Sequence, residues 1–412
     1  MKITRIETIW LEDFPNICWV QIQTDTGLVG LGETFFGARA VAAYLHESAA
    51  PLLLGEDPLR IDWIANRLSP YVGYASSGVE MRGNSAIDIA LWDLFGKATG
   101  LPIYQLLGGR TRERIRTYNT CAGPEYTRRQ ARQAVENWGV ALDGPDPAPM
   151  AGDDGETYED LYGFLHHADD LARSLLDQGI TAMKIWPFDP YAEQSNGTHI
   201  SNRDLRTALE PFDKIRRAVG LDMDIMVEFH ALWNLPTAKR IIAALTPYEC
   251  FWYEDVIRAD SLDGLADLAS TTTVPLTVSE TLTTRWGFRP AFDTGAVGVA
   301  MLDVTWCGGI GEAKKIATMA EAHRLPVAPH DCTGPIALIA STHLSLNVPN
   351  ALIQESVRAS YRGWYRDLVT HLPDVRDGQI TVSDRPGLGT ELRADILQRD
   401  GAHIETSEFA FV

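Results

Sequence analysis

Hydrophobic and polar positions follow two different rhythms in the first quarter of the chain. In residues 1–35, apolar and polar side chains alternate on either side of a turn at residues 25–27, which is typical of a β-hairpin. Residues 38–108 instead show helical spacing, clearest in residues 84–99, where apolar positions share one face before Gly100 ends the helix. The N-terminal region is therefore predicted to be a small α+β unit.

After residue 116, short apolar or β-branched runs alternate with amphipathic helical stretches, the rhythm of a (β/α)8 barrel. Eight runs are candidate strands: residues 116–122, 181–188, 224–229, 250–256, 275–280, 297–304, 325–330 and 351–356. The chain then returns to turn-rich, strand-like sequence that could pair with the N-terminal hairpin. We therefore expect a capping region at 1–115, a barrel at 116–376, and a C-terminal segment at 377–412 that completes the capping region.

Two long irregular stretches follow the first two candidate strands. Residues 139–157 are rich in Pro, Gly and Asp, and residues 187–202 contain Pro, Asn, Gly and Ser. Loops of this length after barrel strands lie at the catalytic face, where specificity is commonly determined. The alternative is that one or both are plain surface loops.

Composition limits the possible functions. With 412 residues, 45% hydrophobic and 22% charged, the chain resembles an ordinary soluble globular protein. No apolar run approaches the ~20 residues that span a bilayer, and the first residues lack the apolar core of a secretory signal. Five widely spaced cysteines without a CxxC pair suggest neither a thiolate zinc site nor a disulfide framework. A cytoplasmic location is expected, with no membrane partner.

The formal net charge of −19 argues against a nucleic-acid partner, because phosphates require a basic face. The same charge would repel an anionic substrate at long range. Any such substrate must therefore meet local positive charge, from a bound divalent cation, from Lys184 or from arginines.

The candidate chemistry lies at the ends of the strands. In a barrel, the carboxyl ends of the strands converge on the catalytic face. Ionisable residues end seven successive candidate strands: Lys184, Glu228 with His230, Glu254, Glu280, Asp303, His330 and Glu355. One such residue carries little information, whereas the whole series is hard to explain as surface decoration.

Three of these residues suggest a metal site. Glu228, Glu254 and Glu280 end neighbouring strands and would repel one another unless a cation neutralised them. Carboxylate oxygens in a near-octahedral arrangement suit Mg²⁺. The alternative is that each glutamate forms a salt bridge at the barrel rim.

The remaining strand ends suggest acid–base chemistry. Asp303 could orient His330, leaving the second ring nitrogen as a base, although a structural histidine bonded to a loop carbonyl is the alternative. His230 lies two positions beyond Glu228 and could protonate a leaving hydroxide, or it could only pack in the loop. Glu355 could donate to an oxyanion if protonated, orient a substrate hydroxyl, or form a rim salt bridge.

Lys184 and Trp186 are two positions apart on one strand and therefore point the same way. Lys184 could neutralise a substrate carboxylate together with the metal. Trp186 cannot exchange a proton, so we expect it to form a wall of the cavity where a second base could have stood.

These residues in this order resemble the enolase superfamily, specifically its mandelate-racemase-like branch, over essentially the whole chain. Residues 84–109 are similar to the family's junction between capping domain and barrel, and residues 303–330 to its sixth and seventh strands with the Asp–His dyad. Within the branch, residues 227–241, 280–290 and 333–356 resemble galactonate-type and mannonate-type sugar acid dehydratases. The resemblance implies a modified TIM (β/α)7β barrel with an α+β capping domain.

The resemblance also implies roles for individual residues. Glu228, Glu254 and Glu280 would bind one Mg²⁺ ion, and Glu355 would contact the substrate. His330, oriented by Asp303, would be the base, and His230 the acid. Three features depart from the family's pattern: Glu228 stands where Asp is usual, Trp186 replaces a second lysine, and the 139–157 insertion matches no known specificity loop.

The predicted reaction is dehydration of an acid sugar, an aldonate, to a 2-keto-3-deoxy acid. A racemase or epimerase, a lactone cycloisomerase, and a non-catalytic barrel that binds a sugar acid are the alternatives. A nucleotide-dependent oxidoreductase lacks support, because no GxGxxG opens a strand–helix unit. Tyr74 and Arg82 in the capping region are candidate substrate contacts, and the family implies a homo-oligomer, either dimer or octamer.

Overall fold

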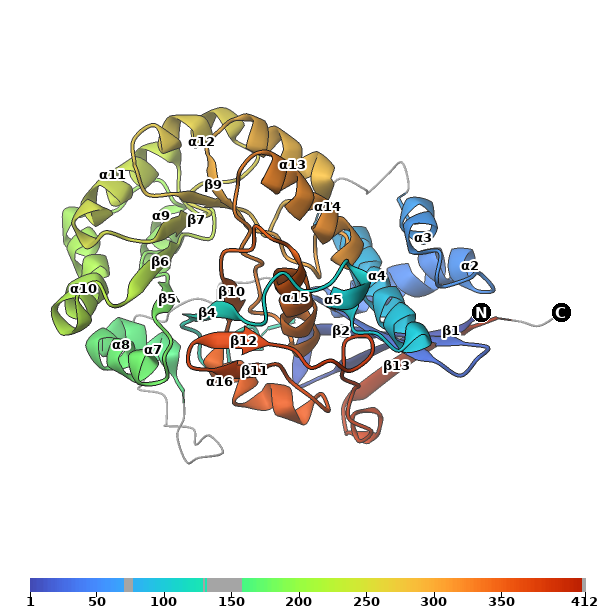
Figure 1. The fold of residues 1–412 in the computed structure, drawn as a ribbon. Helices are drawn as coiled ribbons and strands as arrows, with labels where there is room; N and C mark the ends of the chain where they lie inside the picture. The colour runs from blue at the N-terminus through green and yellow to red at the C-terminus, as the bar shows by residue number, and fades with distance from the viewer. Residues whose placement is uncertain (70–76, 129, 132–157, 410–412) are drawn as a thin grey trace.

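The computed structural model describes residues 1–69, 77–128, 130–131 and 158–409 (Figure 1). The predicted contact Tyr74 and the 139–157 insertion therefore lie outside the described residues. Within the described part of the chain, no helix is both long and apolar enough to cross a membrane.

The N-terminal region forms an antiparallel sheet covered by helices. Its strands are β1 (Ile3–Leu11), β2 (Phe14–Thr24), β3 (Val29–Phe35) and β13 (Ala402–Glu408), in the order β13-β1-β2-β3. The C-terminal strand β13 pairs with β1, so the end of the chain returns to the N-terminal hairpin. The helices are α1 (Ala38–Tyr44), α2 (Ala50–Leu53), α3 (Ile61–Arg67) and α4 (Val79–Thr99), with a π-helical turn at Leu45–Ala49.

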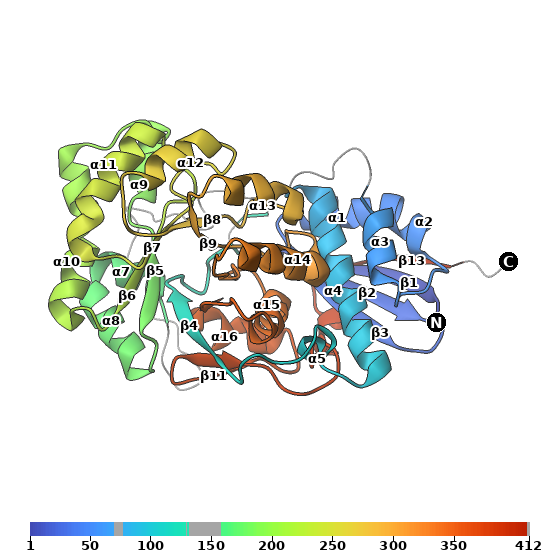
Figure 2. The ribbon, with the colours of Figure 1, turned by 45° about the horizontal axis from the view of Figure 1, so that its top comes forward.

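Two glycines allow α4 to lie directly on this sheet. A Cβ atom at Gly30 or Gly32 would come within 2.1 Å or 1.9 Å of the carbonyl oxygens of Ala90 and Ala86 in α4. Residues with side chains at these positions would push the helix away from β3. Figure 2 shows α4 between the capping sheet and the barrel, where it also contacts α14 (Gly309–Ala322).

The barrel is built from parallel strands in sequence order. They are β4 (Ile115–Thr120), β5 (Ala182–Ile185), β6 (Asp224–Glu228), β7 (Trp252–Glu254), β8 (Leu276–Val278), β9 (Val297–Ala300) and β10 (Gln354–Ser356). Strand β10 pairs back onto β4. The predicted strand 325–330 forms isolated bridges instead of a ladder, with Val327 linking Ala300 to Ala351. Residues 325–330 thus lie between β9 and β10. The predicted α/β barrel fold with its antiparallel capping sheet is confirmed.

Helices surround the barrel strands. They are α7 (Asp160–His166), α8 (Ala168–Asp177), α9 (Asp189–Ser195), α10 (Asn202–Val219), α11 (Leu235–Leu245), α12 (Leu262–Ala269), α13 (Thr284–Asp293), α14, α15 (Pro335–Asn347) and α16 (Arg358–Tyr361). The 187–202 stretch, predicted to be irregular, contains helix α9. Pro190 near the helix start is compatible with this helix, because the first turn needs no backbone donor there.

Short elements complete the chain. The helix α5 (Ile103–Leu106) links the capping region to the barrel, and 3₁₀ turns lie at Thr246–Tyr248, Trp364–Asp367 and Ile396–Gln398. The hairpin β11 (Asp374–Arg376) and β12 (Gln379–Thr381) spans the predicted boundary at residue 377, and β12 pairs with β4. The start of the predicted C-terminal segment thus lies beside the barrel, whereas β13 lies in the capping sheet.

Buried carboxylates join the capping sheet to the barrel. Glu33 on β3 accepts hydrogen bonds from Trp19 Nε1 (2.8 Å) and from the backbone nitrogens of Ile336 (3.1 Å) and Ala337 (3.0 Å) in the first turn of α15. Asp93 on α4 accepts from the backbone nitrogens of Leu31 and Leu388. These bonds fix the capping domain against the segment that follows His330.

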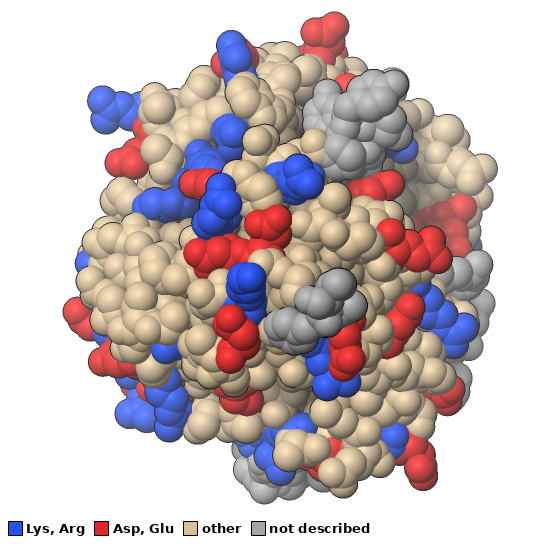
Figure 3. Space-filling view, turned by 90° about the vertical axis from the view of Figure 1, so that its right-hand side faces the viewer, with Lys and Arg blue, Asp and Glu red and all other residues tan. Residues whose placement is uncertain are grey.

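The outer face of the capping domain mixes charges of both signs (Figure 3). In its described part, this face shows no continuous basic patch of the kind that phosphate backbones require.

Candidate active site

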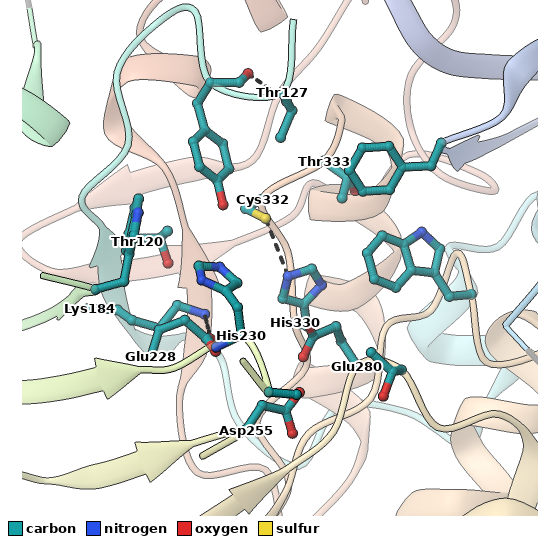
Figure 4. A pocket seen from close by; sticks show the side chains of 16 residues that line it. Thr120, Thr127, Lys184, Glu228, His230, Asp255, Glu280, His330, Cys332 and Thr333 are labelled. Atoms are coloured by element: carbon teal, nitrogen blue, oxygen red, sulfur yellow. Dashed lines mark hydrogen bonds and ion pairs between the residues drawn. The ribbon is translucent and has the colours of Figure 1, made fainter. Parts of the chain in front are cut away.

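A cavity of about 700 Å³, counting its open mouth, lies at the carboxyl ends of the barrel strands. Of the predicted site residues, Lys184, Trp186, Glu228, His230, Glu280 and His330 line it. Figure 4 shows Lys184, Glu228, His230, Glu280 and His330 converging on one space from the barrel strands and the turns that follow them. The capping domain contributes Phe36, which directly follows β3.

His330 and Asp303 form the predicted dyad. The ring nitrogen Nδ1 lies 2.8 Å from Asp303 Oδ2, and the other oxygen of Asp303 accepts from the backbone nitrogen and hydroxyl of Thr305, both at 2.6 Å. Asp303 is fully buried. Burial alone would lower the pKa of His330, but the nearby acidic groups Cys332 and Glu355 outweigh it and raise that pKa well above its ordinary value.

Cys332 is a pocket residue that the sequence reasoning missed. Its Sγ lies 3.3 Å from His330 Nε2, as the dashed line in Figure 4 shows. The other four cysteines are buried, whereas Cys332 is partly exposed. Burial raises the pKa of the Cys332 thiol, although the charge of His330 opposes the shift. The thiol thus contacts the nitrogen of the predicted base.

His230 has a carboxylate partner of its own, Asp189, which the sequence reasoning also missed. The ring nitrogen Nδ1 lies 2.6 Å from Asp189 Oδ2, and Asp189 is fully buried at the start of α9. The backbone of His230 has φ 48°, in the left-handed region. Its backbone nitrogen donates to Glu228 Oε1 at 2.6 Å, which links the histidine to a predicted metal ligand.

Lys184 lies at the centre of the buried carboxylates. Its Nζ is 2.6 Å from Glu254 Oε1, 2.8 Å from Glu355 Oε1 and 3.5 Å from Glu228 Oε2. Burial opposes the charged form, but these carboxylates outweigh it and raise the pKa of Lys184. The lysine therefore remains a cation inside the barrel.

The predicted metal ligands form part of a larger acidic group. Burial and the proximity of Glu228 raise the pKa of Glu254, and burial and the proximity of Glu280 raise that of Asp255. Asp255 directly follows Glu254 and also lines the pocket, which the sequence reasoning did not note. Burial alone would raise the pKa of Glu280, but the charge of His330 and the hydrogen bond with Asp255 lower it.

The donor set fits a hard divalent cation. Among the described residues, no three His, Cys, Asp or Glu side chains stand close enough together to hold a metal ion as they are arranged. However, Glu280 Oε2 and Asp255 Oδ1 are buried, and neither has a hydrogen-bond partner among the residues that the structure describes. The raised pKa values of Glu254 and Asp255 and the unpaired oxygens of Asp255 and Glu280 are features that a bound cation can compensate in place of protons.

Two predicted substrate contacts have other surroundings. Glu355 is buried beneath the pocket lining, where Lys184, Thr120 and the backbone nitrogen of Asp331 (2.7 Å) occupy its oxygens. Although burial opposes ionisation, the charges of Lys184 and His330 lower the pKa of Glu355 to about 2, which favours its ionised form over the protonated donor considered above.

Arg82 lies behind the pocket wall. Its guanidinium carbon is 4.3 Å from the ring centre of Trp306, and its nitrogens donate to the backbone oxygens of Ser77 (2.7 Å) and Phe35. Arg82 therefore supports Trp306, whose ring lies 5.3 Å from that of His330. The sequence did not indicate this stacking, because Arg82 and Trp306 are far apart along the chain.

Aromatic side chains form the walls of the cavity. Trp186 is fully buried, as a wall residue should be, and its ring meets that of His230 edge-on at 6.0 Å. Phe36, Tyr126 and Trp306 also line the pocket. Such walls can pack on the carbon faces of a ligand while the acidic and basic groups meet its oxygens.

Comparisons with known proteins agree with this geometry. A family model described as the mandelate racemase / muconate lactonizing enzyme N-terminal domain matches residues 15–108, and an enolase C-terminal domain-like model matches residues 167–396.

Individual relatives match nearly the whole chain. A D-galactonate dehydratase of Xanthomonas axonopodis pv. citri is 30% identical over 97% of this chain and 94% of its own. A D-galactonate dehydratase family member of Streptomyces bingchenggensis is 32% identical over 95% and 91%. The crystal structure of an Agrobacterium tumefaciens enolase of the mandelate racemase subgroup is 52% identical, with a TM-score of 0.86 over 99% of each chain.

Proposed function

Because the chain belongs to the mandelate racemase / muconate lactonizing enzyme family of the enolase superfamily, we propose that it is a Mg²⁺-dependent dehydratase of an aldonate. The reaction removes the proton at C2 and the hydroxyl at C3, and gives a 2-keto-3-deoxy acid. One observation carries the proposal: two histidines, each with its own buried aspartate, line a single pocket that also contains a lysine and several carboxylates.

Glu228, Glu254 and Glu280 are the residues that would hold the Mg²⁺ ion. Members of the superfamily generally use a divalent metal, which stabilises negative charge on the substrate carboxylate when bound. Lys184 adds a fixed positive charge beside these residues. An anionic substrate is thereby favoured in the pocket despite the acidic protein surface.

The two histidines divide the proton transfers. His330 Nε2 takes the C2 proton, because Asp303 holds the ring through Nδ1 and Nε2 faces the pocket, where the thiol of Cys332, a weak hydrogen-bonding group, is the contact that a substrate would displace. The electron pair of the C2–H bond moves toward the carboxylate and then forms the new C2–C3 double bond. The C3–O bond breaks, His230 donates a proton to the departing hydroxide to form water, and the enol tautomerises.

A racemase or epimerase is the second candidate, and the His230–Asp189 pair is the observation that favours it. A second oriented histidine could return a proton to C2 from another direction. Dehydration is preferred because Trp186 stands where a second lysine base could have been, and because similar proteins are D-galactonate dehydratases. A lactone cycloisomerase and a non-catalytic barrel that binds a sugar acid are the two other candidates.

The substrate is proposed to be a C5 or C6 monocarboxylate sugar acid, with D-galactonate tested first because of the named relatives. We also propose a homo-oligomer, a dimer or an octamer, as the form in which the enzyme works. Size-exclusion chromatography with light scattering distinguishes these two states.

The test is a 2-keto-acid assay. Purified protein with Mg²⁺ is incubated with a panel of C4–C6 sugar acids, and product is detected as the semicarbazone. We expect product from at least one aldonate, abolished by His330→Asn and by His230→Asn. C2 deuterium uptake from D₂O without any 2-keto acid would instead indicate a racemase or epimerase.

A further inference from the structure

We infer that Asp189 is the positioning residue for the leaving-group acid: it holds His230 so that water departs from C3, while it has no part in removing the C2 proton. The inference rests on the proposed dehydration. It assigns a function to a residue outside the pocket lining, contributed by α9 and not by a barrel strand end.

The geometry gives Asp189 control over one ring nitrogen. At 2.6 Å from Asp189 Oδ2, the nitrogen Nδ1 of His230 is engaged in a hydrogen bond with this carboxyl group and is not available to a ligand. Nε2 is then the ring nitrogen that exchanges a proton with a ligand. The arrangement repeats the relation between Asp303 and His330, in which Nδ1 also meets the aspartate.

Three further contacts fix where the ring can lie. The backbone of His230 is held in the left-handed region at φ 48°, and its nitrogen donates to Glu228 Oε1. The next backbone nitrogen, of Ala231, donates to the backbone carbonyl oxygen of Asp255 at 2.6 Å. The edge of the Trp186 ring meets the imidazole at 6.0 Å. A non-glycine residue keeps such a conformation only where its surroundings impose it, which is common at functional sites.

A purely structural role explains Asp189 less well. Its side chain is fully buried, and Oδ1 lacks a hydrogen-bond partner among the described residues. Burial raises the pKa of Asp189, and His230 opposes that shift. A neutral side chain of similar size would avoid the cost of burying this carboxylate, so the charge is better explained by what it does to His230.

If Asp189 acts only on the leaving group, changing it should affect C3–O cleavage without affecting removal of the C2 proton. Most other variants in the pocket would impair both steps together. Asp189→Asn should slow loss of the C3 hydroxyl and leave C2 proton transfer intact. The matched control, Asp303→Asn, alters the partner of the base and should impair both steps. A substrate whose C3 substituent leaves without a proton should be insensitive to Asp189→Asn.

The experiment uses the full-length enzyme with Mg²⁺ and the aldonate found in the panel. It measures kcat and KM for 2-keto-acid formation, C2 hydrogen exchange in D₂O, and fluoride release from the 3-deoxy-3-fluoro analogue. For Asp189→Asn we expect kcat to fall by about 10²-fold or more, with KM, exchange and fluoride release within about threefold of wild type. Asp303→Asn should lower exchange and fluoride release as well.

Two results would overturn the inference. One is Asp189→Asn dehydrating the aldonate at the wild-type rate. The other is equal loss of exchange, fluoride release and dehydration, which would make Asp189 a general structural support. Thermal melting shows whether Asp189→Asn folds. If it does not, Asp189→Glu is used as the test variant, because it keeps the carboxylate and should retain part of the wild-type dehydration rate. Failure of wild-type enzyme to form any 2-keto acid would reject the proposed function itself.

Discussion

Two groups of buried carboxylates can be compared in this molecule, one at the junction of capping domain and barrel and one in the pocket. Glu33 and Asp93 at the junction accept hydrogen bonds at both oxygens, mostly from backbone nitrogens. In the pocket, Glu280 and Asp255 each keep a buried oxygen that has no hydrogen-bond partner in the described part of the chain. Satisfied buried charges indicate structure, whereas unsatisfied ones indicate a site that a ligand or cation completes.

The comparison makes opposite predictions for stability and activity. A junction carboxylate should be needed for folding, because removing it would leave buried N–H groups unpaired. A pocket carboxylate should be needed for activity and dispensable for folding, because removing it relieves repulsion among buried charges.

The largest expected effect is on catalysis. Glu280→Gln should lower kcat/KM by at least about 10³-fold, since it removes a carboxylate proposed to bind Mg²⁺. Its unfolding free energy should be equal to or higher than that of wild type. Assays of 2-keto acid and chemical denaturation measure the two quantities, and a strongly destabilised variant would contradict the distinction.

Next is a stability effect at the junction. Asp93→Ala removes the ion pair with Lys97 (2.7 Å) and the acceptor of two backbone nitrogens. We expect a loss of about 3–5 kcal/mol in unfolding free energy, the usual cost of breaking a buried pair. Denaturant titration measures it. A loss below about 1 kcal/mol would show that the junction does not depend on this carboxylate.

A third effect is the pH dependence of stability. Burial raises the pKa of Asp88, on α4, to about 7, although Gly311 donates to it. The neutral acid is therefore favoured in the folded state. Its contribution to the unfolding free energy is complete below about pH 4 and is lost as the pH rises to about 7. The size of this contribution is about 1.4 kcal/mol per unit of difference between the folded and unfolded pKa. Asp88→Asn should flatten the unfolding free energy over this window. An unchanged slope would exclude Asp88 as its source.

The smallest effect concerns the thiol in the pocket. Iodoacetamide should inactivate the enzyme by alkylating Cys332, because it lines the pocket and the other four cysteines are buried. Cys332→Ser should resist inactivation and keep its activity within about tenfold of wild type, since the hydroxyl can still contact His330. Peptide mass spectrometry locates the label, and labelling of another cysteine at the same rate would contradict the prediction.

The sequence indicated the fold and the residues at strand ends. An ionisable residue that directly follows a strand pattern can be recognised in the sequence without knowing how the side chains pack. It did not indicate Asp189, Asp255 or Cys332. Asp189 and Cys332 lie beyond the strands, so their positions depend on how the loops turn. The signals were present but weak: Asp255 directly follows Glu254, and Cys332 lies two positions after His330.

Residues 325–330, predicted as the seventh barrel strand, take that place: Val327 bridges Ala300 on one side and Ala351 on the other, and backbone hydrogen bonds join the segment to both neighbours. The sequence did not indicate that the pairing consists of isolated bridges and not of a continuous ladder, because that depends on the spacing of neighbouring strands. For Arg82, which was expected to contact substrate, the sequence did not indicate the stacking on Trp306, because the two residues come from distant parts of the chain.

The most direct test of the central claim is the fate of the C2 proton. Wild-type enzyme and His330→Asn are incubated in D₂O with Mg²⁺ and the aldonate that the panel identifies, and C2 hydrogen loss is followed by NMR. We expect C2 hydrogen to be lost with wild type, and this loss to be at least about 10²-fold slower without His330. Equal loss with both proteins would contradict the assignment of His330 as the base.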